Sequence, residues 1–320
     1  MAEPQSRTFD VVIMGGGMAG LLQARHLRRM LPDLSVVIVE PRSDEKIATI
    51  HKIGESTVEI AANFMTKDLG LVDYFIENHP PKCGLNFHWA KDVESTEGMK
   101  DYWSVWALRF PKIAAFQMHR GKLETDLTAM NKADGVTFVH GRVREFEVAK
   151  AGGLHTVRVK RDDREEEILQ GRHLVDAAGR AFLTGRRYDN TIQGPEELWG
   201  LDTSSAWVRV SGVDRSVFDE GADPHLTSTS RYYATNHFFG HGHWSWMIPI
   251  EKDDRSLSIG VVSHRSVIDP KTINTQEKLL AFYKANHKVL YDLIVSGKIE
   301  DFVVWNRLPH LCRTLFGEDW

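Results

Sequence analysis

The sequence has few cysteines, no long apolar run and little net charge, and each absence excludes a class of protein. Cys83 and Cys312 are its only cysteines, which indicates reduced thiols in a cytosolic protein and not a disulfide framework. No stretch approaches the ~20 apolar residues of a membrane span, and the polar N-terminus lacks the pattern of a signal peptide. A net charge of −4 shows none of the excess of basic residues that is typical of nucleic-acid-binding proteins. We therefore expect a globular cytoplasmic protein with neither a membrane nor a nucleic-acid partner.

What the sequence does contain near its start is a glycine-rich turn between apolar segments. Residues 9–14, FDVVIM, and residues 34–40, LSVVIVE, predict two buried strands. Between them, residues 21–31 have apolar side chains at helical spacing. The whole spans about 30 residues, as a dinucleotide-binding βαβ unit requires.

The glycines of this turn have distinct expected roles. Gly15 permits a tight turn, Gly17 allows a diphosphate to approach the backbone, and Gly20 allows helix and strand to pack closely. The free N–H groups at the start of the helix favour phosphate. Glu40, at the end of the second strand, can accept hydrogen bonds from ribose hydroxyls and disfavours a 2′-phosphate. The unit therefore predicts an FAD-like or NAD-like ligand.

The rest of the chain predicts a second layer rich in strands. Strand-like segments occur at residues 82–91, 101–110, 206–213, 231–239, 243–250 and 256–263. We expect an α/β protein with a Rossmann-like dinucleotide domain at 1–186 and an antiparallel β-sheet substrate domain at 187–320. Residues 78–112 are expected to contribute strands to the substrate side. No second GxGxxG is present, which argues against matched domains for FAD and NAD(P)H.

The segment His243–Pro249, HWSWMIP, places two of the nine tryptophans two residues apart. In a strand, positions i and i+2 face the same side, so Trp244 and Trp246 form one aromatic wall. From this segment alone, core packing explains the pair well, because tryptophan is favoured in strands and buries a large area. A functional wall is the alternative.

Taken together, three motifs resemble those of the flavin-dependent halogenases, which share the fold of the FAD-dependent aromatic monooxygenases. They are GGGMAG at 15–20, GEST at 54–57 and WSWMIP at 244–249, and the third, WxWxIP, is the most specific. QMHRGKLE around Arg120 and DAAGR at 176–180 are weaker similarities. In this family a second flavin-contacting segment follows, and we expect this chain to end just before it.

The resemblance implies a reaction and a lysine. A separate flavin reductase supplies reduced FAD, which with O₂ and chloride or bromide gives hypohalous acid. Lys82 is expected to relay the halogen to an electron-rich aromatic substrate, free or tethered to a carrier protein, with Lys52 as the competing candidate. Trp244 and Trp246 would separate flavin from substrate, and Pro249 and Glu55 would line the tunnel between them. A solvated Lys82 at the start of a strand is the structural alternative.

The resemblance also implies a set of flavin contacts. The expected residues are Gly15, Gly17, Met18, Ala19, Gly20, Glu40, Arg42, Ser56, Thr57, Arg120, Val143, Asp176 and Gly179. Arg42 could equally be a surface arginine. Ser56 or Thr57 could instead cap a helix, with Glu59 completing a capping box with Ser56.

Three histidines, His237, His241 and His243, cluster without a zinc-site spacing, so we expect sheet and turn positions and no metal. Two rival functions remain open. An aromatic hydroxylase on the same fold would oxidise NADPH without a reductase. A non-catalytic flavin-fold protein would gain no flavin absorbance when FAD is added.

Overall fold

The computed structural model forms two compact units, each built from separated stretches of the chain. The first comprises residues 1–52, 120–192 and 311–320, and the second comprises residues 53–119 and 193–310. The structure describes residues 6–49, 52–92, 94–106, 112–150, 152–161, 166–219, 231–252 and 255–317. Part of the strand predicted at 101–110 therefore lies outside the described residues. No helix in these ranges has the length and apolar character needed to cross a membrane.

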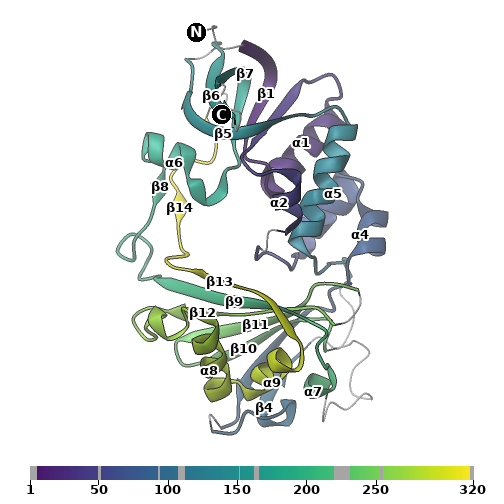
Figure 1. Cartoon of the computed structure of the whole chain (residues 1–320), viewed down its shortest axis with the longest axis vertical. Helices are drawn as coiled ribbons and strands as arrows, with labels where there is room; N and C mark the ends of the chain where they lie inside the picture. Colours follow the sequence, from purple (N-terminus) through teal and green to yellow (C-terminus); the bar gives the residue numbers. More distant parts are fainter. Residues whose placement is uncertain are drawn as a thin grey trace. The chain divides into compact units, whose positions relative to one another are not determined.

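Five strands of the first unit pair in a closed ring (Figure 1). They are β1 (Ser6–Met14), β2 (Val36–Glu40), β5 (Thr137–Glu147), β6 (His155–Arg161) and β7 (Glu166–Asp176). β1 runs parallel to β2 and β7, β2 runs parallel to β5, and β6 is antiparallel to both its neighbours. Val12, Val37 and Leu169 are fully buried in the resulting core. The two strands predicted around the glycine turn are confirmed.

Helices α1 (Met18–Met30) and α5 (Arg120–Ala133) lie side by side in this unit (Figure 1). Asn131 joins them, because its Nδ2 donates to the Leu21 carbonyl at 3.0 Å. The shorter elements of the unit are α2 (Asp44–Thr49), a 3₁₀ turn (Gly179–Ala181), α6 (Leu183–Tyr188) and the paired strands β8 (Thr191–Ile192) and β14 (Leu311–Cys312).

The second unit is built on a seven-stranded sheet. In spatial order its strands are β13 (Lys298–Trp305), β9 (Thr203–Ser211), β12 (Leu257–His264), β11 (His243–Pro249), β10 (Thr235–Gly240), β3 (Leu85–Ala90) and β4 (Tyr102–Val105). All neighbours are antiparallel except β10 and β3. The predicted antiparallel sheet is thus present, with one parallel pair.

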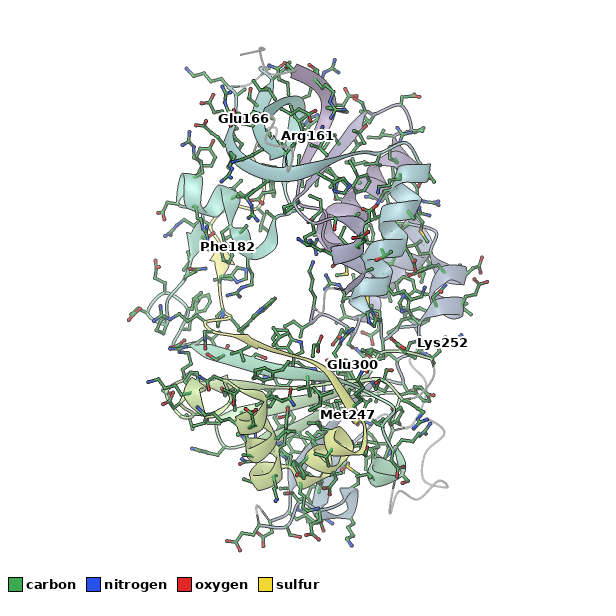
Figure 2. The ribbon with its side chains drawn as sticks, viewed as in Figure 1. Arg161, Glu166, Phe182, Met247, Lys252 and Glu300 are labelled. Atoms are coloured by element: carbon green, nitrogen blue, oxygen red, sulfur yellow. The ribbon has the colours of Figure 1, made fainter. Side chains whose placement is uncertain are left out.

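Helices α8 (Gln276–Asn286) and α9 (Lys288–Ser296) pack on one face of this sheet (Figure 1). Met247 of β11, labelled in Figure 2, belongs to the core beneath them together with Tyr283 and Leu290. The helices leave the opposite face to the tryptophans described below. The remaining helical elements are α3 (Glu59–Asn63), a π-helical turn (Phe64–Asp68), α4 (Val72–Asn78), α7 (Ser216–Asp219) and 3₁₀ turns at Met99–Asp101 and Pro270–Thr272.

Two predictions differ from the structure. The capping box at GEST is wrong: α3 begins at Glu59 after Val58, with no side-chain cap, because the Ser56 and Thr57 hydroxyls bond elsewhere. The predicted domain boundary at 186/187 lies near the junction at 192/193. However, the whole of 53–119, not only 78–112, clusters with the second unit, and 311–320 clusters with the first.

Candidate flavin site and lysine site

The glycine turn has the geometry expected of it. Gly15 has φ of 115°, and a β-carbon there would lie 2.5 Å from the Ala177 carbonyl oxygen. A β-carbon at Gly20 would lie 2.0 Å from the Gly15 oxygen, so strand and helix could not approach as they do. At Gly17 the nearest described atom to a β-carbon, apart from the adjoining residues, would be Lys52 Nζ at 3.6 Å. Gly17 therefore leaves an open backbone surface at the start of α1.

Glu40 lies beneath this turn. Its buried carboxylate accepts from the Gly16 N–H at 2.8 Å and from the Arg42 Nε and Nη2 at 2.5 and 2.9 Å. Burial acts to raise the pKa of Glu40, but Arg42 outweighs it and holds that pKa below the ordinary value. Arg42 is therefore not simply a surface arginine. Its buried Nη1 has no hydrogen-bond acceptor among the described residues.

A second buried carboxylate, Glu124 of α5, was not among the predicted site residues. It accepts from Lys52 Nζ at 2.9 Å, from Arg120 Nη2 at 2.5 Å and from the Met18 N–H at 3.3 Å. The spacing of Arg120 and Glu124, four residues apart, is the signal that could have identified it. Arg120 is the first residue of α5.

These residues fit a dinucleotide. The N-cap residue of α1 is Gly17, which provides no side-chain cap, and the cationic side chains of Arg42, Lys52 and Arg120 gather around Glu124 beside it. The N–H groups of Met18 and Ala19 belong to the same turn. Reduced FAD bound here would supply the activation of O₂.

The other predicted flavin contacts of this unit remain predictions. Val143 lies on β5, paired with Val159. The Asp176 carboxylate accepts from the Ala178 N–H, the Thr184 N–H and the Thr184 hydroxyl, so it orders the turn into α6. Gly179 has φ of 58°, and no described atom lies within 4 Å of a β-carbon built there.

The second unit brings GEST and Lys82 together through a third segment. Residues 115–118 lie between residues 55–57 and residues 80–82. Towards GEST, the Met118 N–H donates to the Glu55 carbonyl at 2.7 Å, and the Thr57 N–H donates to the Phe116 carbonyl at 3.0 Å. Towards Lys82, the Gln117 N–H donates to the Pro80 carbonyl at 3.0 Å, and the Lys82 N–H donates to the Ala115 carbonyl at 2.8 Å. This three-segment framework fixes the backbone at Lys82.

Lys82 is not a solvated lysine. Its side chain crosses the framework, and Nζ donates to the Thr57 carbonyl at 2.7 Å in a residue only 4% exposed. Burial lowers the pKa of the Lys82 amine, and Glu59 acts weakly in the opposite direction. Burial lowers the pKa of Lys52 as well, but that amine forms an ion pair with Glu124 in the first unit. Of the two candidate lysines, Lys82 is the one whose amine donates to a neutral carbonyl.

Ser56, Thr57 and Glu55 are part of the lysine site, in a different unit from the glycine turn. The Ser56 hydroxyl lies 2.7 Å from the Thr235 hydroxyl, to which Gln117 Nε2 also donates at 3.1 Å. The Glu55 side chain is buried. The predicted contacts of Ser56 and Thr57 with flavin, and of Glu55 and Pro249 with a tunnel, remain predictions.

One face of the seven-stranded sheet is lined by tryptophan. Trp244 and Trp246 point to the same side of β11, with ring centroids 5.9 Å apart, as predicted. Strand register puts four more on that side, since directly paired residues share a face. The six are Trp89, Trp103, Trp207, Trp244, Trp246 and Trp305. The aromatic face is thus larger than the motif indicated.

The aromatic face continues to the neighbourhood of Lys82. His237 of β10 stacks on Phe87 of β3, with centroids 5.2 Å apart and planes 16° apart. Burial lowers the pKa of His237, and the positive charge of Lys82 lowers it further. Both strands begin close to Lys82, because the adjacent Cys83 N–H donates to the Tyr233 carbonyl at 2.9 Å, just before β10.

The histidines lie where predicted, His237 and His243 on strands and His241 in the turn between β10 and β11. No group of three or more His, Cys, Asp or Glu residues that could hold a metal is found in the described part of the chain. Sequence reasoning missed a buried contact on the helix-covered face of the sheet, where His243 Nε2 lies 3.0 Å from His287 Nε2.

Comparison with known structures agrees with the fold. The chondrochloren halogenase CndH, described as FAD-dependent, superposes with a TM-score of 0.76 at 16% identity, over 98% of this chain and 67% of that one. The flavin-dependent brominase Bmp2 superposes with a TM-score of 0.74 at 20% identity, over 98% and 71%. The chain therefore has the α/β flavoprotein fold of the FAD-dependent halogenases.

Sequence comparison defines the family more narrowly. A profile of the tryptophan halogenases matches residues 10–105. The flavin-dependent halogenase chlA of Dictyostelium discoideum is 42% identical over 97% of this chain and 54% of its own length. A 1H-pyrrole-2-carbonyl-[peptidyl-carrier protein] brominase of Pseudoalteromonas luteoviolacea is 28% identical over 79% and 55%. The chain is a relative of the flavin-dependent halogenases, and it spans about half the length of the curated relatives it matches.

Proposed function

We propose that this chain provides the flavin-binding and lysine-bearing parts of a halogenase that acts on electron-rich aromatic compounds. The observation that carries the proposal is the Lys82 amine, which is buried and held by a neutral carbonyl on a rigid three-segment framework. The relatives named above are halogenases, and the same lysine lies in the part of the chain that matches their profile.

The dinucleotide site supports the cofactor assignment. FAD, once reduced, supplies the O₂ chemistry that oxidises chloride or bromide to hypohalous acid. Glu40 ends β2, where a dinucleotide-binding unit holds the ribose, and Gly17 lies at the start of α1, where such a unit holds the diphosphate. No second dinucleotide fingerprint is present, which favours a separate flavin reductase as the source of reduced flavin.

The lysine site supports the halogen transfer. A neutral Lys82 amine and hypohalous acid give an N-halo amine and water. The aromatic carbon then takes the halogen, and its proton returns to the amine nitrogen. Only the neutral amine can attack, so a pKa lowered by burial increases the reactive fraction near neutral pH. The Thr57 carbonyl positions Nζ without providing the negative charge that would keep it protonated.

The stacked pair of Phe87 and His237 supports an aromatic substrate beside that amine. A planar ring can lie against these side chains with offset stacking, which contributes about 0.5–1.5 kcal/mol beyond its buried area. Trp246 is held rigid at the neighbouring position because its Nε1 donates to the Ser258 hydroxyl at 3.0 Å. We propose that the aromatic face holds the substrate apart from the flavin.

The test is a product assay by mass spectrometry. The protein is supplied with FAD, a flavin reductase, NADH, bromide or chloride, and a panel of indoles, phenols and pyrroles, each free and as a carrier-protein thioester. The proposal predicts a halogenated product that requires both halide and reductase. A hydroxylated product formed from NADPH without the reductase would establish the aromatic hydroxylase instead. No product and no FAD binding would establish a non-catalytic flavin-fold protein.

A further inference from the structure

The buried carboxylate of Glu124 lies among three cationic side chains. Its carboxylate is 1% exposed and lies within 4 Å of Lys52 Nζ, Arg120 Nη2 and Arg42 Nη1, at 2.9, 2.5 and 3.7 Å. Burial acts to raise the pKa of Glu124, but Arg120 and Lys52 outweigh it and keep that pKa below its ordinary value. The group is therefore an anion at neutral pH.

The position of this anion is informative. Glu124 Oε1 also accepts from the Met18 N–H at 3.3 Å, in the first turn of α1. That N–H follows Gly17, where Lys52 Nζ is the nearest described atom, outside the adjoining residues, that a β-carbon would meet. A dinucleotide diphosphate binds to the N–H groups at this place in a βαβ unit. The Glu124 carboxylate and a diphosphate oxygen would thus use the same donors.

We infer that Glu124 is a positioning residue that substitutes for the cofactor diphosphate, holding Lys52, Arg120 and the Met18 N–H in place until the dinucleotide takes them over. The inference rests on the proposed flavin site. Arg42 would keep its position during the exchange, because Glu40 holds it through two hydrogen bonds.

The charge balance gives the direction of the effect. Three cations face two carboxylates, Glu40 and Glu124, so the cluster has one net positive charge. Neutralising Glu124 adds a second net positive charge and removes a competitor for the Met18 N–H. If Glu124 served only to hold the fold together, its substitution would loosen the site and weaken the binding of a diphosphate.

The test uses the isosteric variant Glu124→Gln and calorimetric titration with ADP and FAD. We expect Glu124→Gln to bind both ligands about tenfold more tightly than the wild type at low salt, as one unit charge close to a diphosphate implies. The difference should shrink at high salt, because salt screens charges. The matched control is Asp126→Asn on the same helix, whose carboxylate pairs with Lys122 instead, and it should bind as the wild type does.

Equal or weaker binding by Glu124→Gln overturns the inference. If the variant is unfolded without ligand, inorganic pyrophosphate should restore its fold by replacing the missing anion, and failure to do so also overturns it. A wild-type protein that binds neither FAD nor ADP would remove the proposed flavin site itself. Wild-type binding with no gain in the variant removes only the role of Glu124.

Discussion

The Lys82 Nζ lies 2.7 Å from the Thr57 carbonyl oxygen, and both residues are buried. Thr57 is itself fixed to the segment 115–118: its N–H and Oγ1 both donate to the Phe116 carbonyl at 3.0 Å, and Oγ1 accepts from the Phe116 N–H at 2.8 Å. The acceptor that holds the amine is therefore set by hydrogen bonds from a segment distant in sequence.

Replacing Thr57 by valine should destabilise the protein and weaken halogenation. The change leaves the buried Phe116 N–H without its acceptor, which costs about 1–3 kcal/mol of unfolding free energy. Urea denaturation measures this loss. Thr125→Val removes a hydroxyl that donates to the Gly121 carbonyl within helix α5, and it should change stability by about 0.5 kcal/mol or less. Equal effects of the two variants would contradict the role given to Thr57.

The pair His243 and His287 predicts that stability falls in acid. Because His243 Nδ1 lies 3.2 Å from the His241 carbonyl, it carries the proton, and His243 Nε2 accepts from the His287 Nε2–H. His287 Nδ1 then accepts from the Tyr102 hydroxyl at 3.1 Å. Both rings are neutral, and a further proton on either would place two N–H groups face to face.

Burial is the main cause that lowers the pKa of His287 to about 3, and the neighbouring His243 and His88 act in the same direction. In the unfolded chain the same group titrates near its ordinary value of 6.5, so the unfolded state binds more protons between these values. The stabilisation is fully present above pH 6.5 and is lost as the pH falls towards about 3, by about 1.4 kcal/mol per pH unit.

Denaturation at a series of pH values measures this slope. His287→Asn should be less stable at neutral pH and should show a shallower decline in acid. His140→Gln, at an exposed position in the first unit, should keep the wild-type slope. Unfolding free energies that do not change between neutral pH and pH 5 would show that the buried pair does not exclude protons.

Two glycines of the turn should respond differently to alanine. Gly20→Ala places a methyl group 2.0 Å from the Gly15 oxygen, so we expect a protein that is strongly destabilised or unfolded. Gly17→Ala places its methyl group 3.6 Å from Lys52 Nζ, with no described backbone atom beyond the adjoining residues within 4 Å, and it should fold normally. However, its methyl group occupies the surface open to a diphosphate, so FAD affinity should fall at least tenfold. Thermal unfolding and FAD titration separate the two effects, and unchanged FAD affinity in Gly17→Ala would contradict the assigned site.

Tryptophans on the aromatic face should differ in their contribution to stability. Trp246 is buried and lies over Gly260, so Trp246→Ala should cost about 3–5 kcal/mol through lost burial and a cavity. Trp103, on the same face, is 67% exposed, and Trp103→Ala should change stability by about 0.5 kcal/mol or less. Denaturant unfolding measures both. Similar losses would mean that the exposed part of the face is covered in solution.

The sequence predicted what local pattern determines. The strands flanking the glycine turn, the conformational roles of Gly15 and Gly20, and the common face of Trp244 and Trp246 follow from spacing and sterics. The capping box failed because Ser56 and Thr57 find partners in Thr235 and Phe116, which are distant in sequence. For the same reason, the contact of Glu124 with Lys52 and that of His243 with His287 could not be predicted, since each joins elements that only the tertiary fold brings together.

The most direct measurement of the central claim separates the formation of hypohalous acid from its delivery. Wild type, Lys82→Met and the exposed-lysine control Lys67→Met are each supplied with FAD, reductase, NADH, bromide and the best aromatic substrate. The halogenated product is quantified against a standard. Free hypohalous acid is collected by a small scavenger. If Lys82 relays the halogen, Lys82→Met releases hypohalous acid to the scavenger but gives at least about 100-fold less halogenated substrate, while Lys67→Met behaves as the wild type. Undiminished halogenation of the substrate by Lys82→Met would contradict the account.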